Sequence, residues 1–248
     1  MGGSSSTPAP PPSPPEPPTP PPPPTFREPW RQVSWGTNER DLQYVKEYQP
    51  QVEEYKTHRI PKEDRGNFYP FVFNDVMGLE EGTGRGISVE DIKLAMMGHV
   101  KEGYKFNPVS LLTSDDHDYN SSPSPDDRVH VLVCVFSANA SELKGSVLMK
   151  MKAVREAASN MGIPQLAVVT KIDEACGETE KDLKTVYKSK YIKKKMTDLS
   201  SALGIPLNCI FPVKNYSQEI STDDNVDSLI LSCLRLIIDF GDDFINNI

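Results

Sequence analysis

Val129–Phe136 (VHVLVCVF) is an almost continuous apolar run, and a second one, Gln165–Thr170 (QLAVVT), follows it after a helical pattern. A short apolar run without alternation is typical of a strand covered on both faces. Between the two runs, residues 144–161 predict a helix that Gly162 ends. Its apolar stripe consists of Leu148, Met151, Val154 and Ala158. This order of strand, helix and strand predicts a parallel pair with a helical crossover.

The same alternation extends in both directions along the chain. Phe68–Val76 (FYPFVFNDV) predicts an earlier strand, and Ser88 begins a helix because a serine with an acid three residues on is typical of a helix start. The remaining expected elements are that helix at 88–100, a long basic helix at 178–203, a short strand at 208–213 and a last helix at 225–247. The sequence therefore predicts an α/β protein with a mostly parallel sheet and helices on both of its faces.

Ligands of such sheets bind at the carboxyl ends of the strands. The first expected strand ends in Asp75-Val76-Met77-Gly78, a D-x-x-G. Asp75 could hold Mg²⁺ through a water molecule, and the N–H of Gly78 could approach a γ-phosphate that any side chain would obstruct. The motif is short, and D-x-x-G also arises by chance.

The strand Gln165–Thr170 leads into Thr170-Lys171-Ile172-Asp173, a T-K-x-D. The carboxylate of Asp173 could accept hydrogen bonds from N1–H and the 2-amino group of guanine, while the stem of Lys171 lies along the ring. Lys214, which follows the last expected strand, could lie behind the guanine base and support it. The sequence therefore predicts a vestigial guanine-recognition element. The alternatives are a surface ion pair for the tetrad and a plain strand-to-loop lysine for Lys214.

Composition excludes several other classes of protein. The chain has 248 residues and a formal net charge of −8, which argues against a dedicated nucleic-acid binder. It contains no run of about 18 apolar residues and no secretory signal. The four cysteines form no CxxC pair and no zinc spacing with histidine. We therefore expect a reduced cytoplasmic protein without a structural metal.

The first residues form a separate region. Residues 1–25 are dominated by proline, so they predict a disordered tail that favours polyproline II, as a stiff spacer or as a ligand for a protein partner. The start, MGGSSS, fits N-myristoylation at Gly2, and a disordered start is the alternative. One acyl chain binds membranes weakly, so membrane contact would need a second signal such as the basic run Lys181–Lys195.

Residues 26–248 resemble the family of interferon-induced protein 44 and 44-like proteins. The resemblance is carried by the two tetrads and by longer runs around them: EPWRQVSWG, NFYPFVFNDVMGLE, MGIPQLAVVTKIDEACGE and GIPLNCIFPVKNY. It implies a cytoplasmic GTPase-like protein of the innate immune and antiviral response. It also implies a P-loop NTPase G domain, with GTP and Mg²⁺ as ligands.

One part of a G domain is missing from the sequence. No Gly-Lys-Ser or Gly-Lys-Thr occurs anywhere, so residues 26–248 are interpreted as a truncated G-domain-like unit that does not hydrolyse GTP. With residues 52–60 as an edge strand, we expect the strand order 52–60, 68–76, 129–136, 165–170, 208–213, in which 68–76 pairs directly with 129–136. The alternative is an exon-skipped or mispredicted product that folds poorly.

Two functions remain open on these grounds. The first is an interferon-inducible GTPase relative with degenerate nucleotide chemistry. The second is a non-enzymatic interaction or scaffold protein that uses its proline-rich tail and helical surface to bind other proteins. A hydrolase is disfavoured because the four histidines lie in no nucleophile arrangement and no G-x-S-x-G occurs. Nucleotide binding separates the two remaining functions.

Overall fold

The computed structural model describes residues 54–62, 66–82, 84–140, 145–217 and 219–247. The proline-rich tail of residues 1–25, with Gly2, lies outside the described residues, as does the first part of the 26–248 unit. No helix in the described ranges combines the length and the apolar character needed to cross a membrane.

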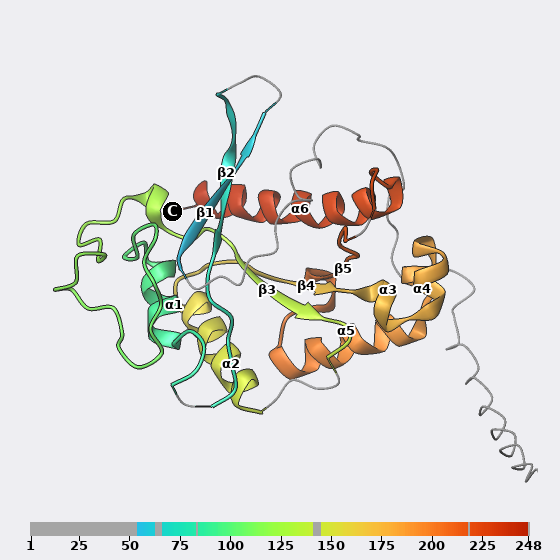
Figure 1. The fold of residues 1–248 in the computed structure, drawn as a ribbon, viewed down its shortest axis with the longest axis horizontal. Helices are drawn as coiled ribbons and strands as arrows, with labels where there is room; N and C mark the ends of the chain where they lie inside the picture. Colours follow the sequence, from blue (N-terminus) through green and yellow to red (C-terminus); the bar gives the residue numbers. More distant parts are fainter. Residues whose placement is uncertain (1–53, 63–65, 83, 141–144, 218, 248) are drawn as a thin grey trace, which may run out of the picture.

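A three-stranded parallel sheet forms the centre of the molecule. Its order is β3 (Leu132–Ser137), β4 (Gln165–Thr170) and β5 (Ile210–Pro212), with β4 in the middle. Helix α6 (Asp224–Ile245) lies along one face, and α2 (Gly145–Asn160) and α5 (Lys190–Leu203) lie along the other (Figure 1). The expected α/β class, with helices on both faces of a parallel sheet, is confirmed.

The first two strands form a sheet of their own. β1 (Lys56–Pro61) pairs antiparallel with β2 (Phe68–Asp75), in a register that runs from Lys56 opposite Asp75 to Pro61 opposite Phe68. Figure 1 shows this hairpin projecting past α6 and away from the parallel sheet. The expected five-strand order is therefore wrong, because β2 does not pair with β3.

Backbone hydrogen bonds explain why the hairpin stays apart from β3. Tyr55, just before β1, donates its N–H to the carbonyl of Tyr104 at 2.8 Å and accepts from the N–H of Gly103 at 2.8 Å. These bonds attach the hairpin to the loop that follows α1 (Val89–Met96). The pairing of β1 with β2 is also local in sequence, so it closes a shorter loop than a pairing with β3.

The apolar side chains form two cores. The first is built around β3, β4 and β5 with α5 and α6, and includes Leu166, Ile172, Ile192, Met196 and Ile210. The second lies between α1, α2 and the loop after α1. It includes Tyr55, Ile87, Ile92, Met96, Phe106 and Ala158. The hairpin is anchored in this second core through Tyr55 and through Val76, Met77 and Leu79, which pack against it.

The expected basic helix at 178–203 is broken into three pieces. They are α4 (Gly177–Lys181), the 3-10 helix η3 (Leu183–Lys188) and α5, preceded by the short α3 (Ile172–Ala175). The breaks fall at Asp182 and Ser189, which are extended and cap the next piece: Asp182 Oδ1 accepts from the N–H of Lys184, and Ser189 Oγ accepts from that of Ile192. Two further 3-10 turns are η2 (Pro125–Asp127) and η4 (Leu207–Cys209).

Candidate functional site

The carboxyl ends of the three parallel strands are joined by hydrogen bonds that position the T-K-x-D. The Thr170 hydroxyl donates to the carbonyl of Phe136 at 3.1 Å, and the Thr170 carbonyl accepts from the N–H of Ala138 at 2.8 Å. On the other side, the N–H of Val213 donates to the carbonyl of Val169 at 2.8 Å. The turn after β4 is therefore held between the ends of its two neighbours, as the sequence pattern predicts.

Lys171 has an unusual backbone conformation. Its φ of 58° and ψ of 37° are left-handed, and no other non-glycine residue in the described ranges has a positive φ. A lysine in this region is uncommon, and such conformations concentrate at functional sites. The turn leads directly from β4 into α3. The Lys171 ammonium lies 3.5 Å from Glu174 Oε1, and Glu174 Oε2 accepts from Asn139 Nδ2 at 2.6 Å.

Asp173 and Lys214 lie next to each other at this edge. Lys214 Nζ is 3.8 Å from Asp173 Oδ2 and 2.7 Å from Glu219 Oε1. The hydrogen bond to Glu219 raises the pKa of Lys214, with a smaller contribution from the Asp173 charge. Both Asp173 and Lys214 are partly exposed. The arrangement thus presents a carboxylate that solvent can reach, which is the group that a planar N–H pair needs as an acceptor.

A buried polar pair supports the segment that carries Lys214. The Tyr216 hydroxyl donates to Asp227 Oδ1 in α6 and accepts from the N–H of Asp223 at 2.8 Å. Burial raises the pKa of Tyr216 above its ordinary range. The pair links the end of β5 to the start of α6. Sequence reasoning missed Glu219, Asn139 and Tyr216, because no motif or spacing marks these residues as neighbours of the tetrad.

The structure does not bring the D-x-x-G to this edge. Asp75 Oδ1 accepts from the N–H of Val76 at 3.0 Å, and the Gly78 carbonyl accepts from the N–H of Ile87 at 3.1 Å. Asp75 is the last residue of β2 and Gly78 follows it; β2 ends beside α1 and α2, whereas α3 lies at the other end of the parallel sheet (Figure 1). Asp75 and Gly78 are thus separated from Thr170, Lys171, Asp173 and Lys214.

The loop after the D-x-x-G binds the ammonium group of a lysine side chain. Lys150 Nζ, from α2, donates to three of its carbonyls: those of Glu80 at 3.0 Å, Gly82 at 3.0 Å and Arg85 at 2.9 Å. A phosphate-binding loop instead turns its N–H groups inward. This loop therefore does not fit the phosphates of a nucleotide.

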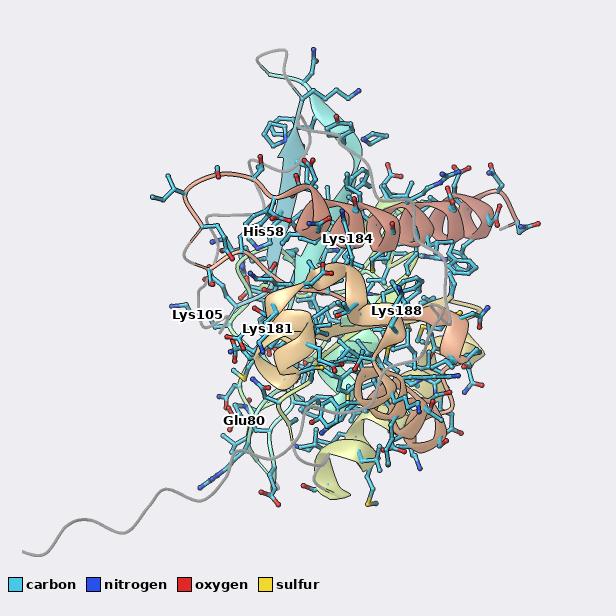
Figure 2. The ribbon with its side chains drawn as sticks, turned by 90° about the vertical axis from the view of Figure 1, so that its right-hand side faces the viewer. His58, Glu80, Lys105, Lys181, Lys184 and Lys188 are labelled. Atoms are coloured by element: carbon cyan, nitrogen blue, oxygen red, sulfur yellow. The ribbon has the colours of Figure 1, made fainter. Side chains whose placement is uncertain are left out.

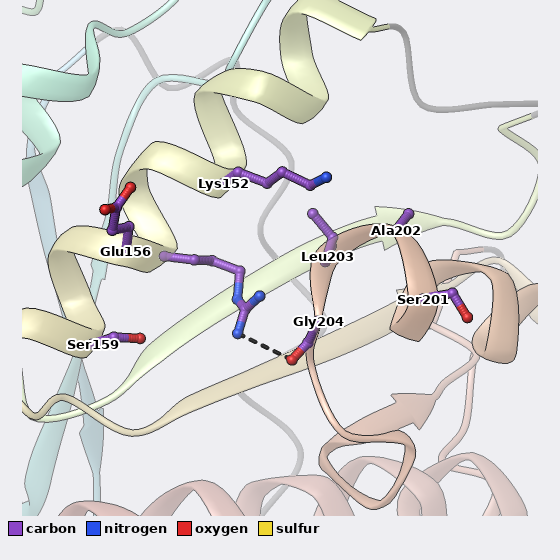
Figure 3. Close-up of a pocket in the computed structure, with 8 residues that line it drawn as sticks. Lys152, Glu156, Ser159, Ser201, Ala202, Leu203 and Gly204 are labelled. Carbon is purple, nitrogen blue, oxygen red and sulfur yellow. Dashed lines mark hydrogen bonds between the residues drawn. The ribbon is translucent and has the colours of Figure 1, made fainter.

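A depression of about 400 Å³ lies elsewhere on the surface. It is lined by Lys152, Arg155, Glu156, Ser159, Ser201, Ala202, Leu203 and Gly204, from α2 and the end of α5 (Figure 3). Arg155 crosses it and donates to the Gly204 carbonyl at 3.4 Å and to Gln165 Oε1 at 2.8 Å. Gln165 is the first residue of β4, so this depression lies at the amino edge of the sheet, opposite the tetrad. Ligands of parallel sheets bind at the other edge.

The described residues define an α/β protein with a parallel sheet whose carboxyl edge carries a T-K-x-D turn. The chain is 34% identical to interferon-induced protein 44 of Pan troglodytes and 33% identical to that of Homo sapiens, each over 197 residues. It is 29% identical to interferon-induced protein 44-like of Homo sapiens over 198 residues. The chain belongs to the family of these proteins.

The similarity covers 79% of this chain but only 44% of each of these relatives, so the chain spans less than half of their length. No family model matches the chain. No solved structure matches it.

Proposed function

We propose that this chain is an interferon-inducible, GTPase-like protein of the innate immune response that recognises guanine weakly and does not hydrolyse GTP. Its similarity to proteins named interferon-induced supports the first part. The observation that supports guanine recognition is the proximity of Asp173 to Lys214 at the carboxyl edge of the sheet. We infer a cytoplasmic location and protein partners, without nucleic acid, as part of the same proposal.

The expected affinity follows from the contacts that remain. A guanine base bound at Asp173 forms two hydrogen bonds to a charged acceptor, each worth about 1.5–3 kcal/mol net. Micromolar affinity requires about 8 kcal/mol, most of which a P-loop supplies through phosphate contacts. The sequence contains no such loop, and the loop of Glu80, Gly82 and Arg85 turns its carbonyls inward. The two bonds together supply about 3–6 kcal/mol, so binding is expected to be far weaker than micromolar, and hydrolysis is not expected.

The second candidate function is a non-enzymatic interaction or scaffold protein. The exposed face of α6 supports it, because Asp239, Asp242 and Asp243 are all exposed there and form an acidic surface. The proline-rich tail of residues 1–25 would be a second site for protein partners. In this case, the carboxyl edge of the sheet has no ligand, and the Asp173–Lys214 contact is structural.

Nucleotide titration followed by NMR tests the proposal. Guanosine and GDP are each expected to shift resonances of the turn after β4 with a Kd of about 1 mM or weaker, and adenosine is expected to shift them less. D173A should abolish the preference for guanine. D198N, which removes an exposed carboxylate in α5, is the matched control and should leave the preference unchanged.

Two results contradict the proposal in different ways. Saturation by GDP at micromolar concentration would show that the chain binds the phosphates, and would overturn the predicted lack of tight binding. Equal shifts with guanosine and adenosine, or none with either, would remove guanine recognition and leave the scaffold function.

A further inference from the structure

The segment Lys181–Lys195 differs in charge from the rest of the molecule. It contains seven lysines and one acid, Asp182, in a chain whose net charge is −8. Lys181 ends α4, and Lys184 and Lys188 lie in η3. Figure 2 shows these three lysines together on the side of the molecule that faces the viewer. We refer to Lys181, Lys184 and Lys188 as the lysine face.

The amines of the lysine face have no hydrogen bond or ion pair within the described ranges. Other lysines of the segment are engaged: Lys194 forms an ion pair with Asp198 at 2.7 Å, and Lys195 Nζ donates to the Ala140 carbonyl at 2.9 Å. Unpaired cations keep their full charge available for a ligand. The lysine face is therefore the part of this segment that is available for binding.

The lysine face is also held in place by the core. Leu183, Val186 and Tyr187 of the same 3-10 helix are buried in the first core. The cap at Asp182, which accepts from the N–H of Lys184 at 3.1 Å, fixes where this helix begins. Because the backbone is fixed on its inner side, the three ammonium groups are presented together as one surface.

We propose that the lysine face binds the surface of an anionic membrane. All seven basic residues of the segment are lysines, and none is arginine. Arginine is the residue suited to bidentate recognition of a defined carboxylate or phosphate, whereas lysine ammonium is a hydrated point charge. None of these three lysines lines the depression at the amino edge of the sheet, so that depression is not a peptide groove beside the lysine face. Point charges on an exposed face suit a diffuse layer of anionic headgroups.

The overall negative charge of the chain does not prevent this contact. Repulsion between exposed charges is screened beyond about 8–10 Å at physiological salt, so a membrane close to the lysine face interacts mainly with the lysines. The acidic remainder of the molecule then favours the orientation in which the lysine face points toward the lipid. Each lysine near such a surface strengthens binding roughly fivefold, so three lysines contribute about a hundredfold. This contribution needs neither Gly2 nor a guanine ligand.

Sedimentation with lipid vesicles tests the proposal. The full chain, without acylation, is mixed with phosphatidylcholine vesicles that contain either no phosphatidylserine or about 30% of it, at about 0.1 M salt. The chain is expected to sediment with the anionic vesicles only, and to be released at about 1 M salt. K181Q/K184Q/K188Q should weaken binding about a hundredfold.

The matched control is K62Q/R128Q/K152Q, which removes three exposed cations outside the lysine face and changes the net charge equally. It should keep most of the binding, and both variants should melt at the wild-type temperature. Equal losses in the two variants, or equal sedimentation with neutral vesicles, would overturn the proposal. Binding to poly-glutamate but not to vesicles would also overturn it, and would assign the lysine face to acidic protein partners.

Discussion

β4 of the parallel sheet and β2 of the hairpin both have largely apolar sequences, but they are buried to different extents. In β4, Leu166, Ala167 and Val169 are all buried, because α6 covers one face of the sheet and α2 and α5 cover the other. In β2, Phe68, Val72 and Phe73 are exposed. Apolar character therefore predicts that a segment is a strand, but the elements that pack on it decide whether it is covered.

β3 shows an intermediate situation. Its Cys134 and Phe136 are buried in the first core, but Val135 between them is 63% exposed. β3 lies at the edge of the three-stranded sheet, with β4 as its only neighbour among the strands that the structure describes. The expectation that Val129–Phe136 is covered on both faces is therefore wrong for Val135, which lies on an edge strand and remains largely exposed.

Truncation of one apolar side chain in each region should show the largest difference. L166A removes most of a fully buried side chain from the middle strand, so we expect it to cost about 2–5 kcal/mol of unfolding free energy. V72A, on the hairpin, removes a side chain that is 44% exposed and should cost less than about 1 kcal/mol. Urea denaturation followed by circular dichroism measures both.

The comparison fails if the two variants lose similar stability. That result would mean that the hairpin and the sheet form one cooperative core, with Val72 covered in solution. Hydrogen exchange gives an independent check, because the amides of β2 should exchange faster than those of β4.

A buried polar pair on the side of the parallel sheet should give the second largest effect. Y216F removes the hydroxyl that donates to the buried Asp227 and accepts from the N–H of Asp223. Because a buried carboxylate loses a donor, we expect a loss of about 2 kcal/mol in the same assay. Y191F is the control: Tyr191 is half-buried beneath Lys195, and its ring keeps that contact, so stability should change little. Equal losses would show that the Tyr216 hydroxyl has no special role.

Structural elements that are determined by residues close together in the sequence could be predicted. Ser88 caps α1 by accepting from the N–H of Asp91 at 3.0 Å, as expected from the acid three residues on. α2 ends at Asn160, and Gly162 has a φ of +73°, in agreement with its predicted role as a helix stop. A glycine adopts this left-handed conformation without steric cost, which explains why the helix ends here.

Features that depend on contacts distant in sequence could not be predicted. The hairpin is placed by hydrogen bonds between Tyr55 and residues 103–104, and no periodicity reveals that pairing. The breaks in the basic helix depend on Asp182 and Ser189, whose polar side chains compete for backbone groups. At the candidate site, the T-K-x-D can be recognised from the sequence because its residues are contiguous. The contacts of Glu219 and Lys150 cannot be predicted from the sequence, because their partners lie in other segments.

A buried carboxyl group in the second core should give the smallest effect, but one with a defined pH dependence. Asp91 is fully buried: its Oδ1 accepts from the N–H of Leu112 at 3.1 Å, whereas its Oδ2 has no partner among the described residues. Burial raises the pKa of Asp91 above its ordinary value of 3.8. The folded protein thus holds this proton more tightly than the unfolded chain, and ionisation costs stability as the pH rises from about 3.8 through the raised pKa.

D91N removes that cost, so it should stabilise the protein at pH 7 by about 1 kcal/mol, or roughly 2–4 °C in Tm. The gain should disappear below about pH 4, where Asp91 is protonated in both states. D116N is the matched control, and its effect on stability at pH 7 should be opposite to that of D91N. Hydrogen bonds from the N–H and hydroxyl of Thr113 lower the pKa of the exposed Asp116, so its replacement should lose stability at pH 7 and not at low pH. If D91N destabilised the protein at pH 7, the charged carboxylate of Asp91 would have a hydrogen-bond partner in solution, as the buried carboxylate of Asp227 has in Tyr216.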